Sequence, residues 1–132
     1  MKRTLNNNGF TLTEILIVVS IIALLAAIAI PNLLKAKISA NDALAKSTLR
    51  SLSTASESFG TSNGGNYPSD ITSLTGAVPA YLNSAYCSQN VNGYTYNCNF
   101  SSSSYVITAT PLVTGKSGTT TYTITTGGLL TP

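Results

Sequence analysis

The most pronounced pattern in the sequence is a nearly continuous run of apolar residues from Phe10 to Ile30. With a rise of about 1.5 Å per residue, these roughly 21 residues would form a helix about 31 Å long, which matches the hydrocarbon core of a bilayer. Pro31 follows this run, and the apolar pattern restarts at Leu33 and Leu34. Because the pattern resumes, we expect the proline to kink the helix rather than to end it.

A second apolar pattern lies beyond the proline, where apolar residues recur at spacings of three, four and seven positions. They form one stripe on an otherwise polar helix: Leu34, Ile38, Ala45, Leu49, Leu52 and Phe59. The stripe predicts that the helix continues to about Ser58 and packs this face on a sheet. The charged residues are expected on its other faces: Lys35, Lys37, Asp42, Lys46, Arg50 and Glu57.

Glycine and asparagine residues between positions 60 and 66 are typical of a helix end. The stretch 67–74 then predicts a loop with one helical turn, for which Ser69 or Asp70 would be the N-cap. Ile71 and Leu74 are the apolar residues of this stretch. We expect both side chains to lie in the core of the globular part that follows the apolar run.

Three later segments, 94–99, 105–110 and 121–125, combine alternating or β-branched residues and are predicted to be strands. The pair Gly127-Gly128 can form a tight hairpin turn, although few residues remain for a return strand. The predicted fold class is α+β. A long N-terminal α-helix, kinked near Pro31, packs on a small antiparallel sheet of three or four strands.

The composition describes a neutral, hydroxyl-rich surface. Only 8% of the residues are charged, against about 25% in typical soluble domains. The formal net charge is +3, but without Lys2 and Arg3 five basic residues face four acidic ones. After Arg50 the only basic residue is Lys116. We therefore expect no specific nucleic-acid partner.

Cys87 and Cys98 are the only two cysteines, and ten residues separate them. An even count in an exported domain predicts one disulfide bond. The alternative is a metal-binding pair, but the chain has no histidine and no acid cluster near these cysteines. We expect neither a metal nor another cofactor.

Catalytic chemistry finds little support in the sequence. Without histidine, no Ser-His or Cys-His nucleophile can form. Asp70 is the only acidic residue after Glu57, so one head has no pair of carboxylates for acid–base hydrolysis. Gly115-Lys116-Ser117 ends like a phosphate-binding loop, but Thr110 stands where that loop needs a glycine. We expect that the protein is not an enzyme.

The start of the apolar run carries one acidic residue, Glu14, preceded by Gly9 and by the basic pair Lys2-Arg3. A charged side chain at membrane depth costs about 3 kcal/mol or more unless it is paired, so this acid suggests a function. It can also be an acid favoured by the dipole at a helix start. Three interpretations of the run remain: a plain membrane anchor, a secretory signal cut near Ala29, or a signal cut after Gly9 that keeps the apolar helix.

The residues of this junction resemble a known family. Gly9-Phe10-Thr11-Leu12-Thr13-Glu14 and the following Ile15 to Val19, with 26–31 as Ala-Ala-Ile-Ala-Ile-Pro, are similar to the class III signal and N-terminal helix of bacterial type IV pilins. The resemblance covers about residues 1–59, and Thr13 departs from the family's usual aliphatic residue. It implies that a prepilin peptidase cuts between Gly9 and Phe10 and methylates the new amine of Phe10. It also implies an assembly salt bridge between Glu14 and the Phe10 nitrogen of a neighbouring subunit.

The resemblance further implies three segments: a class III leader peptide (1–9), a transmembrane and filament-core half of the helix (10–34), and a globular head (35–132). The chain would be a structural subunit of a type IV pilus, a homo-oligomeric helical filament. It would lie in the inner membrane before the pilus assembly machinery moves it to the cell surface. Adhesion, motility and DNA uptake are uses that the sequence does not rank.

Two other fibre proteins are alternatives. One is a pseudopilin of a type II secretion system, but the major pseudopilin typically binds calcium through acids near its C-terminus, and this chain has none after Asp70. The other is the subunit of an electron-conducting filament, which would need aromatic residues along its core, and none lies between Phe10 and Phe59.

The cysteines also lie further from the C-terminus than in many type IV pilins, so loop functions of the family are not transferred.

Overall fold

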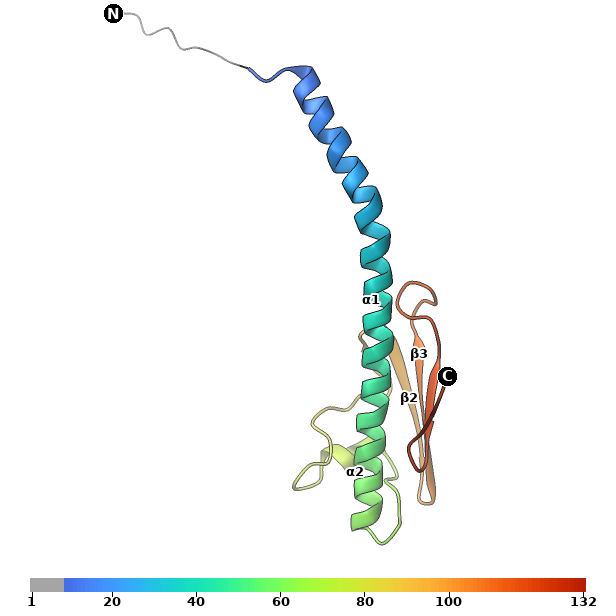
Figure 1. Cartoon of the computed structure of the whole chain (residues 1–132). Helices are drawn as coiled ribbons and strands as arrows, with labels where there is room; N and C mark the ends of the chain where they lie inside the picture. Colours follow the sequence, from blue (N-terminus) through green and yellow to red (C-terminus); the bar gives the residue numbers. More distant parts are fainter. Residues whose placement is uncertain (1–8) are drawn as a thin grey trace, which may run out of the picture. The chain divides into compact units, whose positions relative to one another are not determined.

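The computed structural model describes residues 9–132, so the predicted leader peptide lies outside the described residues except for Gly9. The chain forms two units, one ending at Lys35 and one comprising residues 36–132. The elements are α1 (Leu12–Ser62), α2 (Ile71–Thr75), β1 (Asn90–Val91), β2 (Tyr94–Ser101), β3 (Ser104–Pro111), β4 (Tyr122–Thr125) and β5 (Leu129–Thr131). Figure 1 labels α1, α2, β2 and β3. The predicted α+β class is confirmed.

Helix α1 is 51 residues long and remains helical through Pro31, as the resumed apolar pattern predicted. The kink at this proline stays a prediction. The helix ends four residues later than expected, at Ser62. Gly64 and Gly65 follow with positive φ angles, and the Gly65 amide donates a 2.8 Å hydrogen bond to the Gly60 carbonyl. The glycine-rich stretch thus stops the helix in the left-handed conformation that glycine adopts most easily.

The sheet has five strands in the order β1-β2-β3-β4-β5, and each neighbouring pair is antiparallel. The prediction of three or four strands was therefore too low. Strand β1 has two residues, which is too short for an alternating pattern. Strand β5 returns after the Gly127-Gly128 turn, where both glycines have positive φ angles.

The core of the head lies between the helix and one face of the sheet. Ala45, Leu49 and Leu52 of the predicted stripe are fully buried. They meet inward-facing residues of the strands: Tyr94, Tyr96, Tyr105, Ile107, Ala109, Tyr122 and Ile124. Ile38 and Phe59 are half-buried, whereas Leu34 is exposed, so the stripe was assigned one turn too early.

The short helix α2 covers another part of this core. Asp70 is its N-cap, and its Oδ1 accepts a 2.8 Å hydrogen bond from the Ser73 amide. Of the two candidates for the cap, Asp70 is therefore the one used. Leu74 is buried as predicted, and Ile71 is half-buried and packs against the core.

Candidate functional site

The start of α1 is built around Glu14 and Thr11. The Thr11 amide and the Thr11 hydroxyl each donate a 2.8 Å hydrogen bond to Oε2 of Glu14. In return, the Glu14 amide donates to Oγ1 of Thr11 at 3.2 Å. This reciprocal pattern is a capping box, which satisfies two amides that the helix itself leaves free. Within the chain, Glu14 thus has the role of an acid at a helix start.

The capping box was missed in the sequence, although its signal was present as a threonine three residues before a glutamate. Among the described residues, both hydrogen bonds to the Glu14 carboxylate end on Oε2. The carboxylate therefore keeps an oxygen and its negative charge for another partner. Phe10 lies four residues earlier and is 85% exposed, and Gly9 is exposed beside it.

Between Ile15 and Leu34, helix α1 exposes its large apolar side chains on all sides. Its most apolar 18-residue window has a mean hydropathy of 2.7, and none of that window is buried within the chain. By length and composition this helix can cross a membrane. An isolated apolar surface of this kind needs an apolar environment, either lipid or other helices of the same type.

The head uses two helix carboxylates to hold the helix against the sheet. Oε1 of Glu57 accepts hydrogen bonds from the Tyr105 hydroxyl at 2.8 Å and the Gly127 amide at 2.7 Å, while Oε2 accepts from the Tyr67 hydroxyl at 2.9 Å. Glu57 was expected on a face of the helix outside the apolar stripe, and its carboxylate nevertheless contacts the sheet. A polar side chain can turn towards the sheet when tyrosine hydroxyls meet it there.

Asp42 was also expected outside the apolar stripe and makes equivalent contacts. Its Oδ1 accepts from the Tyr94 hydroxyl at 2.6 Å and from the Thr119 amide at 3.1 Å, and its Oδ2 accepts from the Thr119 hydroxyl at 2.5 Å. Lys46, one turn further along, places its Nζ 4.8 Å from the centre of the Tyr122 ring. This is a cation–π contact rather than a free charge.

These contacts shift the pKa values of the two carboxylates and of Tyr105. Partial burial alone would raise the pKa of Glu57, but the hydrogen bonds from Gly127, Tyr105 and Tyr67 outweigh burial and hold that pKa below its ordinary value. For Asp42, the hydrogen bonds from Thr119 and Tyr94 likewise outweigh burial and lower the pKa. Burial, together with the Glu57 carboxylate, raises the pKa of the Tyr105 hydroxyl to about 12.

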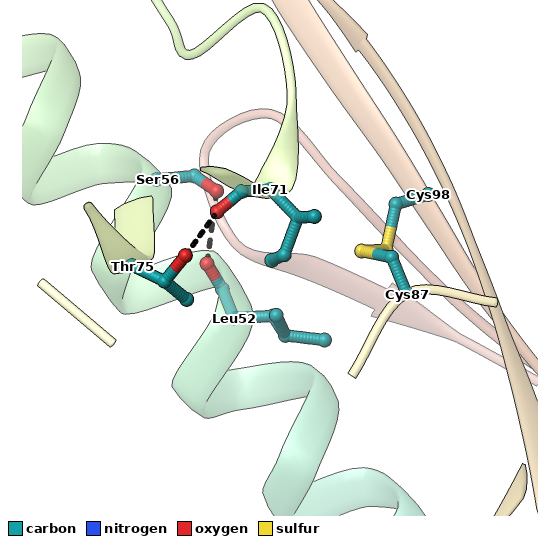
Figure 2. The surroundings of a disulfide bond; sticks show 6 residues. All are labelled: Leu52, Ser56, Ile71, Thr75, Cys87 and Cys98. Carbon is teal, nitrogen blue, oxygen red and sulfur yellow. Dashed lines mark hydrogen bonds between the residues drawn. A yellow bond between two sulfur atoms is a disulfide. The ribbon is translucent and has the colours of Figure 1, made fainter. Parts of the chain in front are cut away.

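The two cysteines form the predicted disulfide, which joins the loop before β1 to strand β2 (Figure 2). Their Cα atoms are 5.5 Å apart. Leu52 of α1 and Ile71 of α2 lie in the surroundings of this bond. The sulfur atoms are therefore not available as a metal-binding pair. Within residues 9–132, no group of three or more potential metal-ligating side chains occurs.

Comparisons with known proteins match the N-terminal segment and, separately, most of the chain. A family model described as a prokaryotic N-terminal methylation motif matches residues 4–30. The type IV major pilin protein PilA of Myxococcus xanthus is 53% identical over 53 residues, which cover 40% of this chain. The chain spans only 24% of the length of that relative.

A second relative matches over most of both chains. The type IV wide pilus major component PilA4 of Thermus thermophilus is 36% identical over 110 residues. The match covers 80% of this chain and 83% of the relative. A comparison with solved structures found no match.

Proposed function

We propose, because this chain belongs to the type IV pilin family, that it polymerises as the repeating subunit of a type IV pilus filament. The observation that carries this proposal is the match to a pilus component along 83% of its length. The exposed apolar half of α1 supports the proposal, because neighbouring copies of the same helix would bury this surface in a filament core. We assign no catalytic activity to the subunit.

The proposed processing site is the bond between Gly9 and Phe10. A prepilin peptidase would cut this bond and methylate the new amine of Phe10. Both residues are exposed, and the bond lies within the segment that matches the methylation motif. Cleavage on this side leaves the apolar helix on the mature subunit.

The proposed assembly contact joins the Phe10 amine of one subunit to Glu14 of a neighbour. The capping box supports it, because Oε2 of Glu14 is held by Thr11 and the carboxylate is thereby fixed in place. An amine buried among apolar helices needs an anion nearby, and a charge-assisted hydrogen bond supplies one. In the filament, Pro31 would allow the helix to bend or loosen around it.

Before assembly, we place residues 10–34 in the inner membrane and the head, residues 35–132, outside it. Residues 15–30 carry no charged side chain, which supports a membrane-spanning stage. The pilus assembly machinery in that membrane would then add the subunit to a filament on the cell surface.

Mass spectrometry and electron microscopy of fibres sheared from the cell surface test this proposal. We expect long fibres whose subunit begins at an N-methylated Phe10. A Gly9→Val variant should keep its leader and form no fibres. Short fibres retained by the cells, with loss of protein secretion on deletion, would instead indicate a pseudopilin. A mature chain that begins near Ala29 would contradict the processing site and the filament together.

A further inference from the structure

The loop between β3 and β4 is fixed to the part of α1 that begins the head (Figure 1). The buried Asn41 side chain donates a 2.8 Å hydrogen bond from Nδ2 to the Ser117 carbonyl. Asp42 accepts hydrogen bonds from both the amide and the hydroxyl of Thr119. Two successive helix residues thus hold the loop in one position.

Close packing reinforces this attachment. A Cβ atom at Gly118 would collide with the Tyr94 ring and its hydroxyl oxygen, and one at Gly93 would lie 2.9 Å from the Asn41 amide nitrogen. Within the loop, the Gly115 amide donates a 2.8 Å hydrogen bond to the Gly118 carbonyl. The tip of the loop is therefore presented as a defined surface.

The tip combines apolar and basic side chains. Leu112 and Val113 are 50% and 52% exposed. They line one open pocket together with Lys37 and Lys116, and no carboxylate is among the described residues that line it. Lys116 is the only basic residue after Arg50 in the sequence. The fold thus places Lys116 of the loop and Lys37 of the helix at the same pocket.

The position of Lys37 indicates what could cover this surface. It follows Leu34, the last residue of the proposed membrane span, by less than one helical turn. A lysine within one turn of the end of a membrane span can reach the lipid headgroups with its long side chain. Lysine ammonium groups attract anionic headgroups, while apolar side chains enter the boundary between headgroups and acyl chains.

We propose that Lys37, Lys116, Leu112 and Val113 form a docking surface for anionic phospholipids of the membrane in which the subunit waits before assembly. This inference rests on the proposed membrane stage. The two lysines bind headgroup phosphates, and Leu112 and Val113 contact the outer ends of the acyl chains. Docking holds the head against the membrane, and incorporation into a filament releases it.

Tryptophan fluorescence tests the docking, because the chain has no tryptophan of its own. The full chain carrying Val113→Trp is reconstituted at low protein-to-lipid ratio in phosphatidylcholine vesicles with or without phosphatidylglycerol. Acyl chains brominated near the glycerol serve as the quencher. We expect strong quenching only in the anionic vesicles. Val78→Trp is the matched control, since Val78 is 99% exposed on another loop of the head and should stay unquenched.

Lysine variants in the Val113→Trp background test the basic part. Lys37→Gln and Lys116→Gln should each lower the ratio of docked to undocked heads about fivefold. Arg50→Gln, which removes one charge elsewhere on the helix, should leave the ratio unchanged. Equal quenching in both kinds of vesicle, or no effect of either lysine variant, would overturn the docking alone. A chain that does not float with the vesicles would overturn the membrane stage and the docking with it.

Discussion

The hydroxyl of Tyr105 on β3 donates a 2.8 Å hydrogen bond to the carboxylate of Glu57 near the end of α1. The same Tyr105 hydroxyl lies 2.7 Å from the hydroxyl of Ser53, which precedes Glu57 by one turn of α1. The ring of Tyr105 is almost fully buried and packs edge-to-face on Tyr67, whose hydroxyl bonds the same carboxylate. Strand, helix and loop thus meet at one polar cluster inside the head.

We expect Tyr105→Phe to lower the free energy of unfolding of the head by about 1–3 kcal/mol, because it leaves part of the Glu57 and Ser53 hydrogen bonding unsatisfied. Thermal unfolding of the full chain in detergent, followed by near-ultraviolet circular dichroism of the tyrosines, measures this change. The signal reports on the head, which holds all seven tyrosines.

Tyr96→Phe is the matched control, since Tyr96 is also a fully buried tyrosine of the sheet. Among the described residues its buried hydroxyl has no hydrogen-bond partner. Removing this hydroxyl should leave stability unchanged or raise it. Equal losses in the two variants would show that removing any buried tyrosine hydroxyl, rather than losing the Glu57 contact, explains the effect of Tyr105→Phe.

The lowered pKa values of Glu57 and Asp42 predict a loss of stability in acid. A carboxyl whose pKa is lower in the folded state stabilises the fold above its unfolded pKa, and this contribution disappears as the pH falls through the folded pKa. The ordinary values are 4.5 for glutamate and 3.8 for aspartate. We therefore expect the melting temperature to fall progressively below about pH 4.5.

The Glu57→Gln variant isolates one contribution to this acid sensitivity. Its side chain still accepts hydrogen bonds but cannot be protonated in this range, so its melting temperature should depend less steeply on pH below 4.5. Melting curves of both proteins between about pH 2 and pH 7 make the comparison. Parallel curves would mean that Glu57 does not contribute to the acid transition.

The disulfide between Cys87 and Cys98 predicts a measurable loss of stability on its removal. For a closed loop of this size, the chain-entropy model gives about 3 kcal/mol. A Cys87→Ser/Cys98→Ser double variant should lose stability of that order. A reducing agent should lower the free energy of unfolding of the native protein towards that of the variant. The same agent should not affect the variant. An unchanged free energy of unfolding would contradict a stabilising role of the bond.

The sequence predicted those parts of the fold that depend on local periodicity. The burial of Leu49 and Leu52 followed from helical spacing, and the positions of strands β2 and β3 followed from alternation and β-branched residues. An N-cap of α2 at Ser69 or Asp70, of which Asp70 is the one used, and the closing glycines of α1 followed from well-established end signals. Strand β1 escaped prediction because two residues are too few to show a period.

Contacts between distant residues could not be predicted in this way. Glu57 meets Tyr105 across 48 positions, and Asp42 meets Thr119 across 77 positions. A helical pattern places charged residues on the solvent side by default, and only the path of the sheet brings hydroxyl donors to them. At the N-terminus the motif identified Glu14, but the local use of Thr11 as its capping partner was overlooked.

Substitutions at Glu14 separate its two roles, because charge and capping can be removed independently. Glu14→Ala removes both and should abolish filaments while membrane insertion remains intact. Glu14→Gln keeps a capping box but loses the charge, so it should also insert and form no filaments. Thr11→Ala weakens the helix start by about 0.5–2 kcal/mol but keeps the carboxylate, so filaments should still form.

Membrane fractionation and electron microscopy of sheared material from the same cells measure insertion and assembly for the three variants. A loss of filaments in Thr11→Ala, with filaments retained in Glu14→Gln, would show that Glu14 acts by shaping the helix start. Filaments absent from Glu14→Gln and present in Thr11→Ala would show that assembly needs the negative charge itself. We expect the second pattern, because only a charged carboxylate compensates the amine that cleavage after Gly9 creates.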